Sequence, residues 1–134
     1  MDRLILDTGV LISAARGQLD LSAITDESDP AVPAIVVAEF LVGARLDDNP
    51  ARAAGKEDFL NAVLSVVPIE DYTADVADHH ADLLAHARRT GRKGGPHDLI
   101  IAATARATKR ILVTTDARAE FDTLPLVQAR VLKD

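Results

Sequence analysis

The sequence contains no cysteine. This absence excludes disulfide bonds, zinc sites with thiolate ligands and cysteine nucleophiles, and it fits a reducing compartment. Aromatic residues make up only 3% of the chain, which argues against a nucleic-acid-binding module that stacks bases on aromatic side chains. We also find no apolar signal segment and no apolar run long enough to span a membrane. We therefore expect a cytoplasmic protein with no membrane association.

The chain has the size and composition of one ordinary globular domain. Its 134 residues are 48% hydrophobic and 27% charged, so a single core can bury enough surface without covalent cross-links. No internal repeat, low-complexity stretch or linker divides it. We therefore expect one domain over residues 1–134.

The charge of the chain is unevenly distributed. The net charge is −6, yet the segment 83–115 contains seven basic residues and a single acid, Asp98. This segment therefore carries +6, which leaves −12 for the rest of the chain. Such an asymmetry can create a local positive field for a polyanion inside an acidic protein. A simple solvated surface is the alternative explanation.

Apolar runs and turn residues predict alternating strands and helices. The predicted strands are 3–7, 31–32, 65–69, 111–114 and 127–132. The predicted helices are 10–16, 34–44, 51–64, 73–89 and 98–108, with a flexible basic loop at 91–96. This alternation is typical of an α/β layer fold with a mainly parallel sheet. Sheets of this type place their sites at the carboxyl ends of the strands.

Four acidic residues occupy positions where a solvated acid is not expected. Asp7 and Asp116 follow predicted strands, and Asp98 opens a predicted helix. Each of these three has an ordinary explanation, as a turn aspartate or a helix cap. Glu39 differs because it lies inside an apolar run, where an unpaired buried carboxylate is costly. It needs either an ion-pair partner, such as Arg45, or an open cleft.

Taken together, the four acids predict a metal centre. Strands of a parallel sheet end at one edge, and Glu39 and Asp98 are expected near the starts of helices that begin at that edge. Converging carboxylates repel one another unless a cation lies between them. Oxygen ligands without cysteine or paired histidines favour Mg²⁺ or Mn²⁺ over zinc. Two such ions about 3.5–4 Å apart can activate a water for phosphodiester cleavage and stabilise the leaving oxygen.

Four motifs resemble those of the PIN-domain ribonucleases, and specifically of the toxin component of VapBC-type toxin–antitoxin pairs. They are Leu4-Ile-Leu-Asp-Thr8, Val37-Ala-Glu-Phe-Leu-Val-Gly43, Asp98-Leu-Ile-Ile-Ala-Ala-Thr-Ala105, and Leu112-Val-Thr-Thr-Asp116 followed by Phe121. The resemblance extends over nearly the whole chain. It implies a three-layer α/β/α fold, in which helices cover both faces of a mainly parallel sheet.

The resemblance also implies an activity, which is endonucleolytic cleavage of RNA with one or two Mg²⁺ or Mn²⁺ ions. The implied catalytic and metal-binding residues are Asp7, Glu39, Asp98 and Asp116. Thr8 and either Thr114 or Thr115 match hydroxyl positions. Of these, we expect Thr8 and Thr115 to orient a carboxylate or a metal-bound water, unless they are ordinary turn and strand-end residues. Pro33 departs from the family pattern, because many relatives carry a hydroxyl residue there. This departure affects how the following helix begins and not the acid centre.

Partners follow from the same resemblance. Family members are commonly homodimers that are held inactive by a small antitoxin, which often places a basic side chain among the acids. RNA is the implied substrate. Contacts between cations and phosphates position RNA without reading its sequence. The basic residues that we expect to bind the RNA backbone or the antitoxin are Arg88, Arg89, Arg92 and Lys93.

Several alternatives remain open. The Asp-Thr-Gly sequence at residues 7–9 matches retropepsin-like aspartic proteases, but those are essentially all-β. A receiver-type phosphoacceptor domain is α/β, but its adjacent acids and its late lysine are not evident. An RNA-processing nuclease outside a toxin system and a module that only binds a partner are the other options. The histidines form no zinc signature; we expect His79 and His80 on a solvated helix face and His97 in a surface loop.

Overall fold

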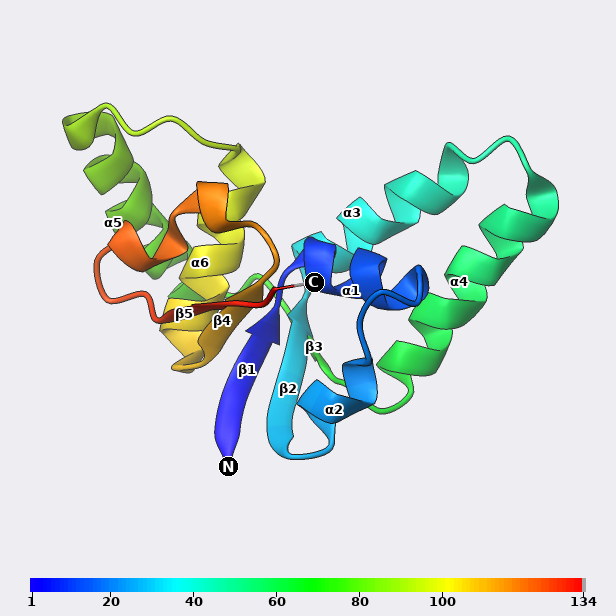
Figure 1. The fold of residues 1–134 in the computed structure, drawn as a ribbon. Coiled ribbons are helices and arrows are strands. Elements are labelled where there is room, and N and C mark those ends of the chain that lie inside the picture. The colour runs from blue at the N-terminus through cyan, green and yellow to red at the C-terminus, as the bar shows by residue number, and fades with distance from the viewer. Residues whose placement is uncertain (134) are drawn as a thin grey trace.

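Five strands form the centre of the protein in a computed structural model that describes residues 1–133 (Figure 1). They are β1 (Asp2–Leu6), β2 (Ser28–Pro33), β3 (Ile69–Glu70), β4 (Ile111–Thr114) and β5 (Ala129–Val131). Their order in the sheet is β3-β2-β1-β4-β5, and every strand pair within the described residues is parallel. Because β1 pairs with both β2 and β4, the carboxyl ends of β1 and β4 lie side by side at one edge.

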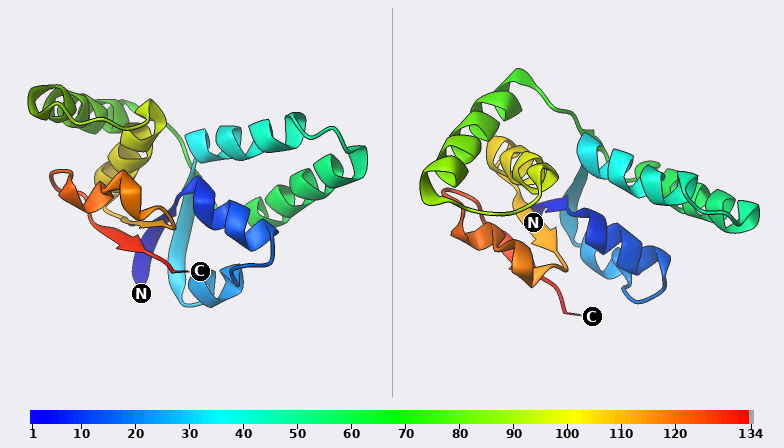
Figure 2. Two further views of the ribbon diagram at one scale, coloured as in Figure 1. Left: turned by 45° about the horizontal axis from the view of Figure 1, so that its top comes forward. Right: turned by 90° about the horizontal axis from the view of Figure 1, so that it is seen from above.

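Helices cover both faces of this sheet. The helices are α1 (Thr8–Ala15), α2 (Leu21–Thr25), α3 (Ala34–Arg45), α4 (Pro50–Leu64), α5 (Ala74–Thr90) and α6 (Pro96–Thr108), with short 3-10 turns η1 (Ala117–Ala119) and η2 (Phe121–Thr123). Right-handed crossovers place helices on opposite faces when the chain reverses its direction across the sheet. Figures 1 and 2 show α1–α4 on one side of the strands and α5 and α6 on the other. The prediction of a three-layer α/β/α fold is confirmed.

Local capping signals define where several helices begin and end. Asn49 caps α4 by accepting a hydrogen bond from the Arg52 amide, and Pro50 supplies the first helical position. The Thr73 hydroxyl accepts from the Val76 amide at the start of α5, and Gly91 ends that helix with φ 65° in the left-handed region. These signals are local, which is why the predicted helices lie close to the observed ones.

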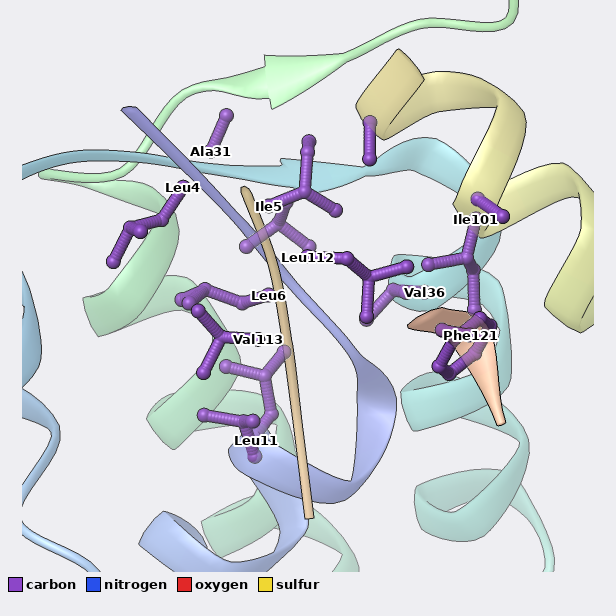
Figure 3. Close-up of a cluster of buried hydrophobic side chains, with 14 of the residues drawn as sticks. Leu4, Ile5, Leu6, Leu11, Ala31, Val36, Ile101, Leu112, Val113 and Phe121 are labelled. Carbon is purple, nitrogen blue, oxygen red and sulfur yellow. The ribbon is translucent and has the colours of Figure 1, made fainter. Parts of the chain in front are cut away.

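The core lies between the sheet and its two helical layers. Leu4, Ile5 and Leu6 of β1 are buried on both faces, as expected for a central strand of a parallel sheet. Figure 3 shows them beside Leu112 and Val113 of β4. The helices and the segment after β4 contribute further apolar side chains to the same cluster, among them Leu11, Val36, Ile101 and Phe121.

Several predicted boundaries were wrong. The strand predicted at 65–69 is only Ile69–Glu70, and the strand predicted at 127–132 is only Ala129–Val131. The helix predicted from residue 98 begins at Pro96, because proline is well suited to the first turn of a helix. The short helix α2 was not predicted. Within residues 1–133, no helix combines the length and apolar character that a membrane crossing requires.

Candidate active site

Four elements bring the candidate acids to the carboxyl edge of β1 and β4. Asp7 directly follows β1, and Asp116 lies two residues after β4. Asp98 is in the first turn of α6. Glu39 is the sixth residue of α3, deeper in its helix than its predicted place near the helix start. Helices α3 and α6 contact each other, so the elements that carry these two acids are neighbours.

Asp7 is held by two hydrogen bonds. It is 8% exposed, and its Oδ1 accepts from the Thr8 amide at 2.8 Å, which caps α1. Its Oδ2 accepts from Thr114 Oγ1 at 2.7 Å. Burial raises the pKa of Asp7, the two hydrogen bonds oppose that shift, and the negative charges of Glu39 and Asp116 raise the pKa further. Asp7 therefore caps α1 with one carboxylate oxygen, as expected of a turn aspartate. Its other oxygen is held by Thr114 of β4.

Thr114 links Asp7 to the segment that carries Asp116. Besides donating to Asp7, Thr114 Oγ1 accepts from the Asp116 amide at 3.0 Å. This residue was passed over in favour of Thr115, whose Oγ1 instead lies so close to Gly9 that a Cβ there would overlap it. Glycine thus allows the first turn of α1 to approach the chain after β4. The carboxylate-orienting hydroxyl at this position is that of Thr114.

Removing the Thr114 hydroxyl tests this link directly. Because Thr114 is 1% exposed, Thr114→Val leaves a buried Asp7 oxygen and the Asp116 amide without their partner. We expect a loss of about 1–3 kcal/mol in the free energy of unfolding, measured by urea denaturation. Thr114→Ser keeps the hydroxyl and should retain most of this stability. Stability in Thr114→Val equal to that of the wild type would show that the hydroxyl does not hold these groups.

Glu39 is contacted by a threonine hydroxyl and a histidine ring rather than by an arginine. Its Oε1 accepts from Thr8 Oγ1 at 2.8 Å, and its Oε2 lies 3.3 Å from His97 Nδ1. Arg45, the partner considered from the sequence, pairs with Glu57 instead. The Glu39 side chain is 29% exposed, and it borders a cavity of about 640 Å³ between α1, α3 and α4. The expected opening is therefore present, whereas the expected arginine partner is replaced by Thr8 and His97.

Asp98 differs from the other three acids, whose side chains all accept hydrogen bonds. It is half-buried, and within residues 1–133 no donor forms a hydrogen bond to its side chain. The cap of α6 is Gly95, and no side chain supplies the capping bond. Burial raises the pKa of Asp98, the negative charges of Asp7, Glu39 and Asp116 raise it further, and the positive charge of Arg92 opposes these effects. Helix capping alone therefore does not explain an acid at this position.

Asp116 is exposed, and its Oδ1 accepts from the Arg118 amide at 2.9 Å, so it caps η1. Its charge nevertheless acts on both Asp7 and Asp98. The four acids therefore form one electrostatic group made only of oxygen donors, which is the chemistry that Mg²⁺ and Mn²⁺ require. Within residues 1–133, no three such side chains stand close enough to form a complete ligand set. The oxygen-donor chemistry and the mutual repulsion of the acids both fit a divalent cation.

The basic cluster separates into two kinds of residue. Arg88, Arg89 and Lys93 are exposed. Arg92 instead donates to the backbone carbonyls of Ala119 and Glu120 and to Thr123 Oγ1 at 2.6 Å. Its guanidinium thus ties the glycine-rich loop before α6 to the segment after Asp116. This engagement removes Arg92 from the freely exposed cations, and it was not predicted.

The histidines also differ from expectation. His79 and His80 are partly buried rather than solvated; His80 Nδ1 lies 2.8 Å from the Tyr72 hydroxyl, and burial lowers the pKa of His80. His97 is not in a loop but in the first turn of α6. The sequence did not predict the contact between His97 and Glu39. The only signal in the sequence was that His97 lies next to Asp98.

Comparisons with known proteins agree with this geometry. The PIN domain family model matches residues 4–125. The chain is 27% identical over 129 residues to the tRNA(fMet)-specific endonuclease VapC of Shigella flexneri, covering 91% of this chain and 92% of the relative. It is 38% identical over 92 residues to Ribonuclease VapC2 of Haemophilus influenzae, covering 68% and 66%.

A solved structure shares the fold. The crystal structure of VapBC2 from Rickettsia felis, bound to a DNA fragment from their promoter, contains a chain that superposes with a TM-score of 0.87. The sequence identity is 24%, and the match covers 98% of this chain and 99% of that chain. The family model spans most of the sequence and includes all four acids, so the protein belongs to the PIN-domain family.

Proposed function

We propose that the protein is a Mg²⁺- or Mn²⁺-dependent endoribonuclease and the toxin of a type II toxin–antitoxin pair. The observation that carries this proposal is the half-buried Asp98 carboxylate, which lacks a hydrogen bond within residues 1–133 and is raised in pKa by burial and then by the charges of three other acids. Two relatives whose names describe ribonuclease activity support the choice of RNA. An RNA substrate also agrees with the expected cytoplasmic location.

The residues that would hold one or two ions are Asp7, Glu39, Asp98 and Asp116. A bound cation would supply Lewis acidity, which would make a nearby water a better nucleophile and would stabilise negative charge on the phosphate. The chain itself supplies orientation. The Thr8 amide and Thr114 hydroxyl hold the two oxygens of Asp7, and the Thr8 hydroxyl holds one oxygen of Glu39. No side chain is required as a covalent nucleophile.

Three exposed cations supply the sequence-independent part of RNA binding in this proposal. Arg88 and Arg89 lie in the last turn of α5, and Lys93 lies in the loop that leads to Asp98. Contacts of this kind weaken as salt rises because they release counterions. The same surface is available to an antitoxin, so RNA and antitoxin are expected to compete.

The antitoxin is expected to reach the acids through the cavity beside Glu39. Phe40 and Phe59 supply apolar lining, and Gly43 and Gly55 leave space where other residues would project side chains. Four neighbouring carboxylates attract a basic side chain from a partner, which would neutralise the site without a cation. The solved VapBC2 complex supports this class of partner. The homodimer implied by the resemblance stays a prediction.

Cleavage of a structured RNA by the purified protein tests the proposed activity. We expect cleavage with Mg²⁺ or Mn²⁺ and none with EDTA, because the acids need a cation to face the phosphate. Asp122→Asn, which removes an exposed acid of η2, should cleave like the wild type. Failure of the wild type on several RNAs, with no Mn²⁺ binding by calorimetry, would favour the alternative of a partner-binding module.

Induced expression in bacteria separates the toxin role from housekeeping RNA processing. A growth arrest that requires the active wild-type protein, and that a co-expressed antitoxin relieves, supports the toxin. Normal growth with full cleavage in vitro would favour an RNA-processing nuclease outside a toxin system.

A further inference from the structure

His97 contacts an acid that lies 58 residues earlier in the chain. Its Nδ1 is 3.3 Å from Glu39 Oε2, while Thr8 Oγ1 is 2.8 Å from Glu39 Oε1. An ionised carboxylate only accepts hydrogen bonds, so the imidazole must carry its proton on Nδ1, as one neutral tautomer and the cation both do. The two oxygens of Glu39 are thus held by donors from two different helices, α1 and α6.

Stability does not account for this contact. The side chains of His97 and Glu39 are 52% and 29% exposed, and exposed ion pairs contribute only about 0–1 kcal/mol. The contact instead removes freedom from a long side chain. One donor to one oxygen leaves the plane of the Glu39 carboxylate free to turn, whereas a second donor to the other oxygen fixes it. Ordering a long side chain such as glutamate costs conformational entropy.

The backbone around His97 is well suited to this task. Gly95 and Pro96 begin α6, and proline fixes the backbone angle of the first helical position. His97 and Asp98 follow on the same turn. The helix that presents the Asp98 carboxylate therefore also presents the donor that orients Glu39, so the two acids are placed relative to each other by one rigid element.

We propose that His97 is a positioning residue for Glu39, which it orients toward a divalent cation through its Nδ1–H group. This inference rests on the proposed metal-dependent function. It concerns how tightly the cation is held rather than the chemistry of cleavage. A fixed carboxylate binds a cation more tightly, because binding then costs less side-chain entropy. Hydrogen bonds that orient metal ligands are worth about 10- to 100-fold in metal affinity.

Three substitutions at one position distinguish this role. His97→Ala removes the donor and should weaken Mn²⁺ binding by about tenfold in calorimetry of the RNA-free protein. His97→Asn places an amide nitrogen near the Nδ1 position and should restore most of the affinity. His97→Gln places its amide further out and should restore less. Saturating Mn²⁺ should return the cleavage rate of the alanine variant to near that of the wild type.

A second background shows whether His97 acts through Glu39. In Glu39→Gln, the added His97→Ala change should have no further effect on Mn²⁺ affinity, because the carboxylate it orients is gone. A full additional loss there would overturn the proposal, as would unchanged affinity in His97→Ala alone. His86→Ala on α5 is the matched histidine control and should bind Mn²⁺ like the wild type. If the wild type neither binds Mn²⁺ nor cleaves RNA, the proposed function fails and this role fails with it.

Discussion

Replacing Asp98 by asparagine should reduce RNA cleavage by more than about 100-fold, a larger loss than is typical of groups that only support metal ligands. Asparagine keeps the shape of the side chain and removes the charge that a cation requires. Cleavage and Mn²⁺ binding are measured on the same preparation. Asp78→Asn removes an exposed acid from α5 and should leave both unchanged. Cleavage by Asp98→Asn within about tenfold of the wild type would contradict the assignment of Asp98 as a metal ligand.

The same variant should be more stable than the wild type at neutral pH when EDTA removes the metal. Burial, and then the charges of Asp7, Glu39 and Asp116, raise the pKa of Asp98 above its ordinary value of 3.8. A raised pKa in the folded state means that the stability contributed by this group is fully present below its ordinary pKa. That stability is lost as the pH rises through the folded pKa. Asp98→Asn has no such loss, so its Tm should rise relative to the wild type between about pH 4 and 7. A lower Tm at pH 7 would instead indicate that Asp98 stabilises α6.

Replacing Arg110 by methionine should cost about 3 kcal/mol or more in the free energy of unfolding and lower Tm by on the order of 10 °C. The Arg110 side chain is 5% exposed. It donates to the carbonyls of Leu4 in β1 and Asp29 in β2, and to the Glu70 carboxylate in β3. Methionine fills similar volume but leaves these acceptors unpaired. Urea denaturation measures the change.

An exposed arginine provides the control for this measurement. Arg130 pairs with Asp2 at 3.0 Å, with side chains 49% and 58% exposed. Arg130→Met should therefore cost less than about 1 kcal/mol. Similar losses in the two variants would mean that burial of Arg110 adds nothing to stability. Full loss of cleavage in Arg110→Met under conditions where it remains folded would point to an unexpected role at the active site.

The order of strands and helices could be predicted because its signals are local. Leu4–Leu6 form an apolar run that ends in an acid, and Asn49-Pro50 opens a helix in the usual way. The two-residue strand β3 had no comparable signal, since its pairing depends on β2 lying beside it. The predicted strand therefore begins too early, directly after α4.

The placement of the four acids at one end of the sheet could be predicted from the sequence, but the groups that hold them could not. The role of these acids as metal ligands stays a prediction. Thr114 and Thr115 are adjacent hydroxyl residues at the end of a strand, and only the direction of each side chain decides which one meets Asp7. Glu39 finds its donors 31 and 58 residues away. No local pattern reports contacts of that range.

The positive segment at 83–115 is less positive at the surface than its charge count indicates. Arg110 is buried against Glu70 and Asp29, and Arg106, which is 11% exposed, pairs with Asp82. The guanidinium of Arg92 is engaged by the segment after β4. A count of charges treats every arginine as solvated, whereas here several stabilise the fold.

The position of β4 has a consequence for how the protein is made. β4 pairs with β1 at the centre of the sheet, although Leu6 and Val113 are separated by most of the chain. Asp7 and Asp116 therefore come to the same edge of the sheet only after β4 has been synthesised and has paired with β1. Pairing over such a separation forms late in folding. A nascent chain on the ribosome thus has no assembled acidic site until nearly all its residues have emerged, so synthesis is separated in time from the onset of cleavage.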